Sequence, residues 1–416
     1  MKYSLFTLAG LTSCMLSSIA TADQMHYRNI IIGERAQGLG GAYVGVSDDA
    51  SGVYYNPAGL AFAQSNDISG SANAFYSKTV TYKKALFGYE DWKEKSGGTF
   101  APFFGAMQKL DKYLPGLVGG FAYYMTDSEL KDQDDLIAGK YGLTRFHRSA
   151  NQRASTYVAA GALGYRVSPN LGIGLGLGYV KADELIQVSQ NQVFTNYYLL
   201  QSLRESLIVH GAQASFGIQW APSSKVALGF TAKSGAYASQ KLIQTTDFLE
   251  LSTEGIKSTP TEITSSNPLG SMPLELRAGL AWFASPRFLL TTDVDWHDKA
   301  KDMDSKTSGV YSRDAVLNYA MGMEYYATPS LPLRAGFFTN NDATPNPTTS
   351  GSHSADHIDY MGLTIFAALA QPTSQLSAGV VLQKGTGKAK KLGNAAVLQD
   401  VEALAYTLAF SATHSF

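Results

Sequence analysis

The sequence predicts an all-β protein: a membrane-spanning antiparallel β-barrel of about fourteen strands, with an N-terminal hatch, or plug, inside its lumen. The 416 residues include 40 Gly and 24 Tyr but only 16% charged residues, which is typical of membrane barrels. Apolar and polar residues alternate along many segments, and short and long connections alternate between those segments. After the N-terminus, no window approaches the roughly 20 apolar residues that a membrane-spanning helix needs.

The N-terminus has the three parts of a secretory signal peptide. Lys2 supplies the positive charge, residues 5–16 form the apolar core, and Ala20-Thr21-Ala22 is a small-residue cleavage site. We therefore expect three divisions of the chain, which are a signal peptide at 1–22, the hatch at 23–66 and the barrel at 67–416.

Cys14 is the only cysteine, and it lies inside the signal segment. Residues 11–14 also look like a lipoprotein cleavage box, which would place a lipid on Cys14. The apolar run continues past Cys14 as far as Ile19, and this favours ordinary cleavage. In that case the exported chain has no disulfide, thiol nucleophile or cysteine-based metal site.

Residues 35–62 form an irregular Gly-rich stretch that predicts a compact plug. Gly38, Gly40 and Gly41 permit sharp turns and close approach to another backbone. Pro57 fixes its own φ and keeps Asn56 out of the helical region, which marks a turn. The segment is too irregular for a strand and too rich in Gly and Ala for an ordinary amphipathic helix.

Period-two alternation predicts the strands. It is clearest in 171–179, 212–220, 226–233 and 288–297. A soluble β-sandwich would give the same alternation. A lipid-facing wall around a wet lumen is favoured because charges and glycines occupy the polar face of successive strands. The apolar face also ends in aromatic residues, as in a membrane girdle. These aromatic residues are Trp220, Trp282 and Trp296.

Connections of two lengths predict the strand count. The short turns each contain a proline, where a strand ladder must stop. They lie near 114–116, 168–170, 222–224, 285–286, 328–330 and 372–374. The long loops are expected at 83–97, 129–151, 189–205, 241–272, 298–313, 341–356 and 386–399. Six turns and seven loops give about fourteen strands, with both chain ends on the side of the short turns, as in bacterial barrels.

The stretch from Arg35 to Phe62, RAQGLGGAYVGVSDDASGVYYNPAGLAF, resembles the N-terminal hatch of the FadL/TodX family. These are outer-membrane barrels that carry long-chain fatty acids and other hydrophobic compounds. The alternating final segment that ends in Phe416 resembles the signal read by the outer-membrane assembly machinery, although His414 departs from it. The resemblance implies a fourteen-stranded barrel with a plug in the outer membrane of a Gram-negative-type bacterium.

The same resemblance implies a gate. Asn56, Pro57 and Ala58 match the part of the hatch that blocks the lumen beside an irregular third strand. Gly119 and Gly120 lie in the predicted third strand, and paired glycines there suggest a kink or bulge. A kink would open a lateral exit for an apolar ligand. The alternative is that the two glycines only make room for the plug.

Apolar residues in two expected outer loops predict a ligand entry site, because outer loops in water should be polar. In the family the third and fourth outer loops form a hydrophobic groove. The alternative is that these segments pack as a lid or extend the strands. The entry candidates are Phe194, Tyr197, Leu199, Leu200, Phe248, Leu249 and Leu251.

Arg166, Arg277 and Arg334 are expected to face the lumen near the short turns. A guanidinium can bind a carboxylate through two hydrogen bonds, which would suit a fatty-acid headgroup. The alternative, which we favour, is an internal network with lumen acids such as Asp293 and Asp295.

No catalytic arrangement is recognisable, and no cofactor or metal is expected. His353, Asp356, His357 and Asp359 have a metal-like spacing but lie in a Ser/Thr/Asn-rich loop. His297, together with the acids of its strand face, could hold a cation or form a hydrated network. The net charge of −1 does not indicate a basic surface for binding nucleic acid.

The sequence therefore favours a non-enzymatic channel for passive uptake of hydrophobic molecules such as long-chain fatty acids. Its partners would be these small molecules, outer-membrane lipid and, during biogenesis, the assembly machinery. A secretion-associated barrel that acts as a scaffold for a protein partner is the alternative. A general porin for polar solutes fits less well, because a porin lumen is open and has no plug.

Overall fold

A computed structural model describes residues 25–86, 90–138, 144–265, 271–302, 311–348, 356–390 and 397–416. The expected signal peptide at 1–22, including Cys14, lies outside these ranges. Among the described residues, no helix has both the length and the apolar character needed to cross a membrane.

Fourteen antiparallel strands close into a barrel, which confirms the predicted fold class. Each strand pairs with its neighbours, and the closing pairs are β1 with β18 and β7 with β10. The barrel strands are β1 (Asp67–Leu86), β2 (Glu90–Lys109), β3 (Leu117–Ala138), β4 (Arg145–Ser168), β5 (Leu171–Phe194), β6 (Tyr197–Ser223), β7 (Val226–Ser252), β10 (Ser271–Ser285), β11 (Phe288–His297), β14 (Val316–Thr328), β15 (Leu331–Asn340), β16 (His357–Ala370), β17 (Ser374–Ala389) and β18 (Gln399–Ser415).

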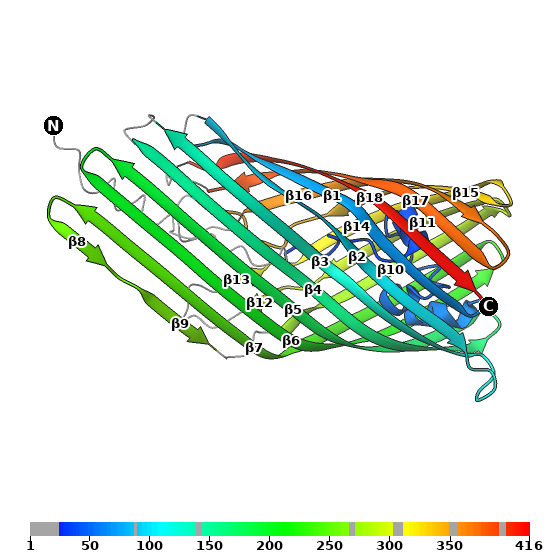
Figure 1. Cartoon of the computed structure of the whole chain (residues 1–416). Coiled ribbons are helices and arrows are strands. Elements are labelled where there is room, and N and C mark those ends of the chain that lie inside the picture. Colours follow the sequence, from blue (N-terminus) through cyan, green and yellow to red (C-terminus); the bar gives the residue numbers. More distant parts are fainter. Residues whose placement is uncertain are drawn as a thin grey trace.

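The wall of the barrel is uneven in height. The six proline-containing turns all lie at one end, as predicted. Strands β4 to β7 have 24 to 27 residues, whereas β11 and β15 have 10. The tall strands extend beyond the rest at the end opposite the C-terminus (Figure 1). There, β8 (Gly255–Ser258) and β9 (Thr261–Ser265) pair with β7, while β12 (Ala300–Asp302) pairs with β13 (Tyr311–Arg313).

The two faces of the wall differ as the alternation predicts. On β5, the outward Leu175 and Leu177 are 65% and 73% exposed, whereas Val180 and Ala182 on the inward face are buried. The same pattern holds on β16 and β18, whose outward side chains are large and apolar. An apolar outer face of this kind suits contact with lipid.

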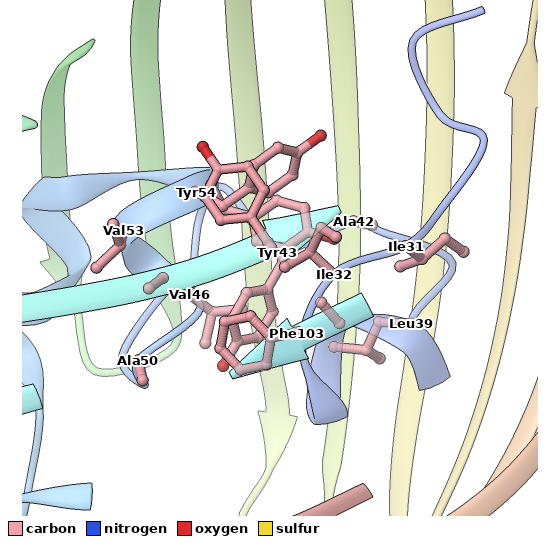
Figure 2. Close-up of a cluster of buried hydrophobic side chains, with 14 of the residues drawn as sticks. Ile31, Ile32, Leu39, Ala42, Tyr43, Val46, Ala50, Val53, Tyr54 and Phe103 are labelled. Atoms are coloured by element: carbon pink, nitrogen blue, oxygen red, sulfur yellow. The ribbon is translucent and has the colours of Figure 1, made fainter. Parts of the chain in front are cut away.

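Residues 25–66, which we call the N-terminal segment, lie inside the barrel. They include α2 (Glu34–Gly38), α3 (Gly52–Tyr55) and the 3-10 helix η1 (Pro57–Phe62). Figure 1 shows these helices (blue) inside the wall, near the end that carries the C-terminus. Figure 2 shows their buried side chains gathered together, with Phe103 of β2 beside them.

Glycines on the inner face of the wall let the N-terminal segment approach it closely. A Cβ atom at Gly174 of β5 would lie 2.3 Å from the carbonyl carbon of Pro57. A Cβ atom at Gly217 of β6 would lie 2.1 Å from Oδ1 of Asn56. The backbone of η1 therefore packs directly on the backbone of the strands, where no side chain fits.

We expect Gly174→Val to displace the N-terminal segment, because the new side chain overlaps the backbone of Pro57. Overpacking of this kind costs about 1–3 kcal/mol of folding free energy. Limited proteolysis should then cleave the segment, while the heat-dependent shift of the barrel on gels reports whether the wall still folds.

Gly161→Val is the matched control, because Gly161 faces outward and a Cβ atom there meets only the Gly120 carbonyl oxygen, at 3.9 Å. Equal protection of the segment in both variants would show that the close approach at Gly174 is not required.

Candidate functional site

Buried ion pairs attach the N-terminal segment to one side of the lumen. Arg28 donates from Nε and Nη2 to Oδ2 of Asp295 on β11, at 2.9 and 2.5 Å. Asp293, on the same strand face, accepts from the backbone N–H groups of Tyr43 and Val44. A buried charge is tolerated only when it is paired, so these contacts fix the segment in register with β11.

A second ion network lies on β14 and β15. Glu324 of β14 accepts from Arg35 of the N-terminal segment and from Arg334 of β15. Arg334 also donates to Glu34, at 2.5 Å, and Gln375 of β17 donates to the same carboxylate. The network therefore joins the segment to three strands.

The three arginines predicted as headgroup ligands are all engaged by the protein. Nε of Arg166 donates to the Ala61 carbonyl oxygen at 2.9 Å, and its guanidinium lies over the Phe62 ring. Arg277 contacts Glu275 at 2.5 Å, and Arg334 belongs to the network described above. Arg277 and Arg334 therefore lie in internal ion networks of the kind that the sequence analysis favoured, whereas Arg166 binds a backbone carbonyl.

Asn56 is fully buried and holds the turn before η1. Its Oδ1 accepts from the Ala58 N–H at 3.1 Å. Its Nδ2 donates to the Val44 carbonyl at 3.0 Å and to the Ile218 carbonyl of β6 at 3.1 Å. The Asn56 side chain thus joins two parts of the N-terminal segment to the wall. Pro57 and Ala58 pack on inward glycines of β5 and β6, such as Gly174 and Gly217.

A cavity of about 150 Å³ lies in the lumen beside the N-terminal segment. Aromatic and aliphatic side chains supply much of its lining, together with the ion pair between Lys233 and Glu275. Its aromatic and aliphatic members include Tyr27, Tyr54, Val158, Val180, Ala182 and Met272.

The wall is interrupted between β2 and β3. Ser96 pairs with Lys131, and pairing resumes only where Phe103 faces Tyr124. Within the described part of the chain, Gly97 and Gly98 have partners on β1 and none on β3. We call this interruption the wall gap.

Two features of the strands explain the wall gap. Pro102 lies inside β2 and has no N–H to donate to a ladder. On the other side, β3 shifts register against β4 between Met125 and Asp127. A bulge of this type bends its strand and turns the adjacent side chains.

The predicted irregularity at Gly119 and Gly120 is wrong. Both residues pair regularly with β2 and with β4. A Cβ atom at Gly120 would lie 2.8 Å from Val53 and 3.0 Å from Leu60 of the N-terminal segment. Gly120 thus makes room for the plug, which is the alternative given by the sequence.

A cavity of about 420 Å³ occupies the wall gap. It is lined from β2 by Gly97 and Gly98, from β3 by Leu130, and from β4 by Arg153 and Tyr157. A smaller cavity of about 30 Å³ is lined from β1, β3 and β16 to β18. The smaller cavity shares Tyr76, Ser128 and Glu129 with the wall-gap cavity, and Asp127 with the lumen cavity. Shared lining residues therefore make the three cavities a series of neighbours from lumen to wall.

The entry candidates lie in strands, so the expectation that they form loops at 189–205 and 241–272 is wrong. Phe194 ends β5, Tyr197 begins β6, and only two residues join them. The inward Leu199 is buried, whereas Leu200 pairs with Leu249 on the outward face. The remaining candidates, Phe248 and Leu251, lie on β7 beside Gln201 and Tyr198. The set therefore divides between the two faces of the tall wall.

The described residues contain no group of three or more His, Cys, Asp or Glu side chains that could hold a metal ion. His297 stacks on Tyr27 with ring centroids 3.8 Å apart. His357 lies 3.6 Å from Asp359 and also contacts the Thr344 carbonyl oxygen. His353, the first member of the metal-like pattern, lies outside the described residues.

Solved structures of outer-membrane channels share the fold. A Pseudomonas aeruginosa FadL homologue has a TM-score of 0.64 at 14% identity, over 94% of this chain and 100% of that one. The P. putida toluene transporter TodX has a TM-score of 0.64 at 12% identity, over 92% and 97%. The Ralstonia pickettii toluene transporter TbuX has a TM-score of 0.60 at 10% identity, over 94% and 99%.

Comparison with curated protein sequences found no match. The family model for outer membrane protein transport proteins (OMPP1/FadL/TodX) matches residues 15–416. With a match over most of its length, and with the barrel described above, the chain belongs to the OMPP1/FadL/TodX family.

Proposed function

We propose that the protein is an outer-membrane channel for passive uptake of hydrophobic small molecules, gated by the N-terminal segment. The observation that carries this proposal is the series of cavities from the lumen to the wall gap. A molecule that follows it passes beside the N-terminal segment, which lines the lumen cavity, and leaves the barrel sideways between β2 and β3 to reach lipid.

The part of the wall where the tall strands β4 to β7 extend beyond the others suits capture of such molecules. Leu200 and Leu249 lie opposite each other on β6 and β7, and the neighbouring Leu251 is 41% exposed. Exposed apolar residues of this kind offer a first contact for a hydrophobic solute. On the inward face, Leu199 and Leu203 are buried and alternate with polar residues such as Gln201.

Gating is assigned to Asn56, Pro57 and Ala58. Asn56 bonds both the segment and the wall, so a change there loosens both contacts together. Long-chain fatty acids are the cargo suggested by the sequence resemblance. A carboxylate would need a cationic partner, and Arg166, Arg277 and Arg334 are already engaged.

Blocking the wall gap should stop uptake. We expect Ser128→Cys, in a Cys14→Ser background, to lose uptake of radiolabelled toluene after reaction with a bulky charged thiol reagent, because Ser128 lines the gap. Uptake should fall to the level of cells without the channel and should return when a reductant removes the label.

Ser239→Cys is the matched control, since Ser239 is exposed on β7, away from the wall gap. If labelled Ser128→Cys transports as well as labelled Ser239→Cys, the cargo does not leave through the gap.

Asn56→Ala should loosen the gate. It removes three hydrogen bonds and leaves buried backbone groups without a partner, at a cost of about 1–3 kcal/mol for each group. We expect faster hydrogen exchange across residues 52–62 and a higher rate of toluene uptake. Asn170→Ala, in an exposed turn, should change neither quantity. A loosened segment with unchanged uptake would contradict the gating role.

A further inference from the structure

The lumen cavity contains a compensated set of charges. Its lining includes two cations, Lys233 and Arg313, and two acids, Asp127 and Glu275, so their formal charges sum to zero. Nζ of Lys233 lies 3.0 Å from Oε1 of Glu275, the residue that pairs with it across β7 and β10. The cation nearest to a bound molecule is therefore neutralised by its neighbour on the adjacent strand.

Glu275 has a second cation behind the cavity. Nε of Arg277 lies 2.5 Å from Oε1 of Glu275, and Nη2 of Arg277 donates to the Tyr54 hydroxyl at 3.0 Å. The same tyrosine ring lies under Lys233, 4.6 Å from Nζ to the ring centroid. One carboxylate thus pairs with two cations at the wall of the cavity, and Asp295, 3.7 Å from Arg277, is a second acid beside them.

The cavity is large enough for one aromatic ring. A cavity of about 150 Å³ in a protein interior is large enough to bind benzene, and this one has the same volume. Tyr27 and Tyr54 present aromatic rings to it, with Val158 and Val180 on the other strands. Aromatic rings pack favourably against such a lining.

We propose that Glu275 sets the charge selectivity of the channel: by pairing with Lys233 and Arg277 it suits the lumen cavity to an uncharged molecule, such as one with a single aromatic ring, and excludes carboxylates. This inference rests on the proposed function, and it names the cargo of that same site. Since the cations already have their counter-charge, a carboxylate that enters the cavity loses its hydration and gains no partner.

Glu275→Gln tests the proposal. The substitution keeps the shape of the side chain and leaves the cavity lining with a net charge of +1. Arg277 keeps Tyr54 and, at 3.7 Å, Asp295, so the variant retains partners for its buried cation. Equilibrium dialysis of the full chain in lipid nanodiscs would measure binding of radiolabelled toluene and benzoate, which share a ring and differ in charge.

The wild-type protein should bind toluene and not benzoate. In Glu275→Gln, the ratio of benzoate affinity to toluene affinity should rise about tenfold or more, as expected for an uncompensated charge at contact distance. Adding Lys233→Met should abolish the gain. Glu250→Gln is the control, because it replaces a carboxylate on the tall part of β7, outside the cavity lining.

Three results would overturn the inference. Benzoate binding by the wild-type protein, no gain in Glu275→Gln, or an equal gain in Glu250→Gln would each show that Glu275 does not set selectivity. In all these cases toluene uptake, and with it the proposed function, would stand. Absence of toluene binding and uptake in the wild-type protein would instead contradict the proposed function, and this inference with it.

Discussion

The pairing of buried charges between the N-terminal segment and the wall is the constraint on which the rest of the structure depends. Arg28 meets Asp295 where both side chains are buried, and Arg35, which is one-fifth exposed, meets the buried Glu324. Breaking a buried pair by removing one partner costs about 3–5 kcal/mol. These pairs hold one side of the N-terminal segment firmly against β11 to β15. The position of its opposite side depends on the strands that pack against it.

On that other side, close backbone contacts accompany the hydrogen bonds made by Asn56 and Arg166. Gly174 and Gly217 let η1 lie directly on β5 and β6, and Gly120 admits Val53 and Leu60 from α3 and η1. The two modes of attachment differ in energy, because each van der Waals contact is weak, whereas a buried ion pair is costly to break. The segment thus has a fixed side and a side that moves at lower cost, and the wall gap lies beyond the latter, between β2 and β3.

The sequence predicts the barrel well because alternation and turn chemistry are local. Each proline-containing turn lies where a pair of strands ends, as predicted. The apolar face of each strand follows from its alternating residues, as in β5. The wall gap was not predicted, because Gly97-Gly98 and Gly119-Gly120 are both paired glycines, and either pair suggests an irregular strand. Pro102 distinguishes them, since only β2 combines paired glycines with an interior proline. The partners of Arg334 could not be predicted either, since Glu34 lies 300 residues away in the chain.

The charges of the lumen also bear on how a passive channel with a polar interior can carry apolar cargo. A wall that presents uncompensated charge holds ordered water and binds ions, and a hydrophobic molecule must displace both. Here the charged groups satisfy one another, as Glu275 does for Lys233 and Arg277. The aromatic and aliphatic side chains between them then form the surface that a solute meets. Polar residues hold the N-terminal segment in place. Because these residues pair with one another, the apolar side chains dominate the surface of the lumen cavity.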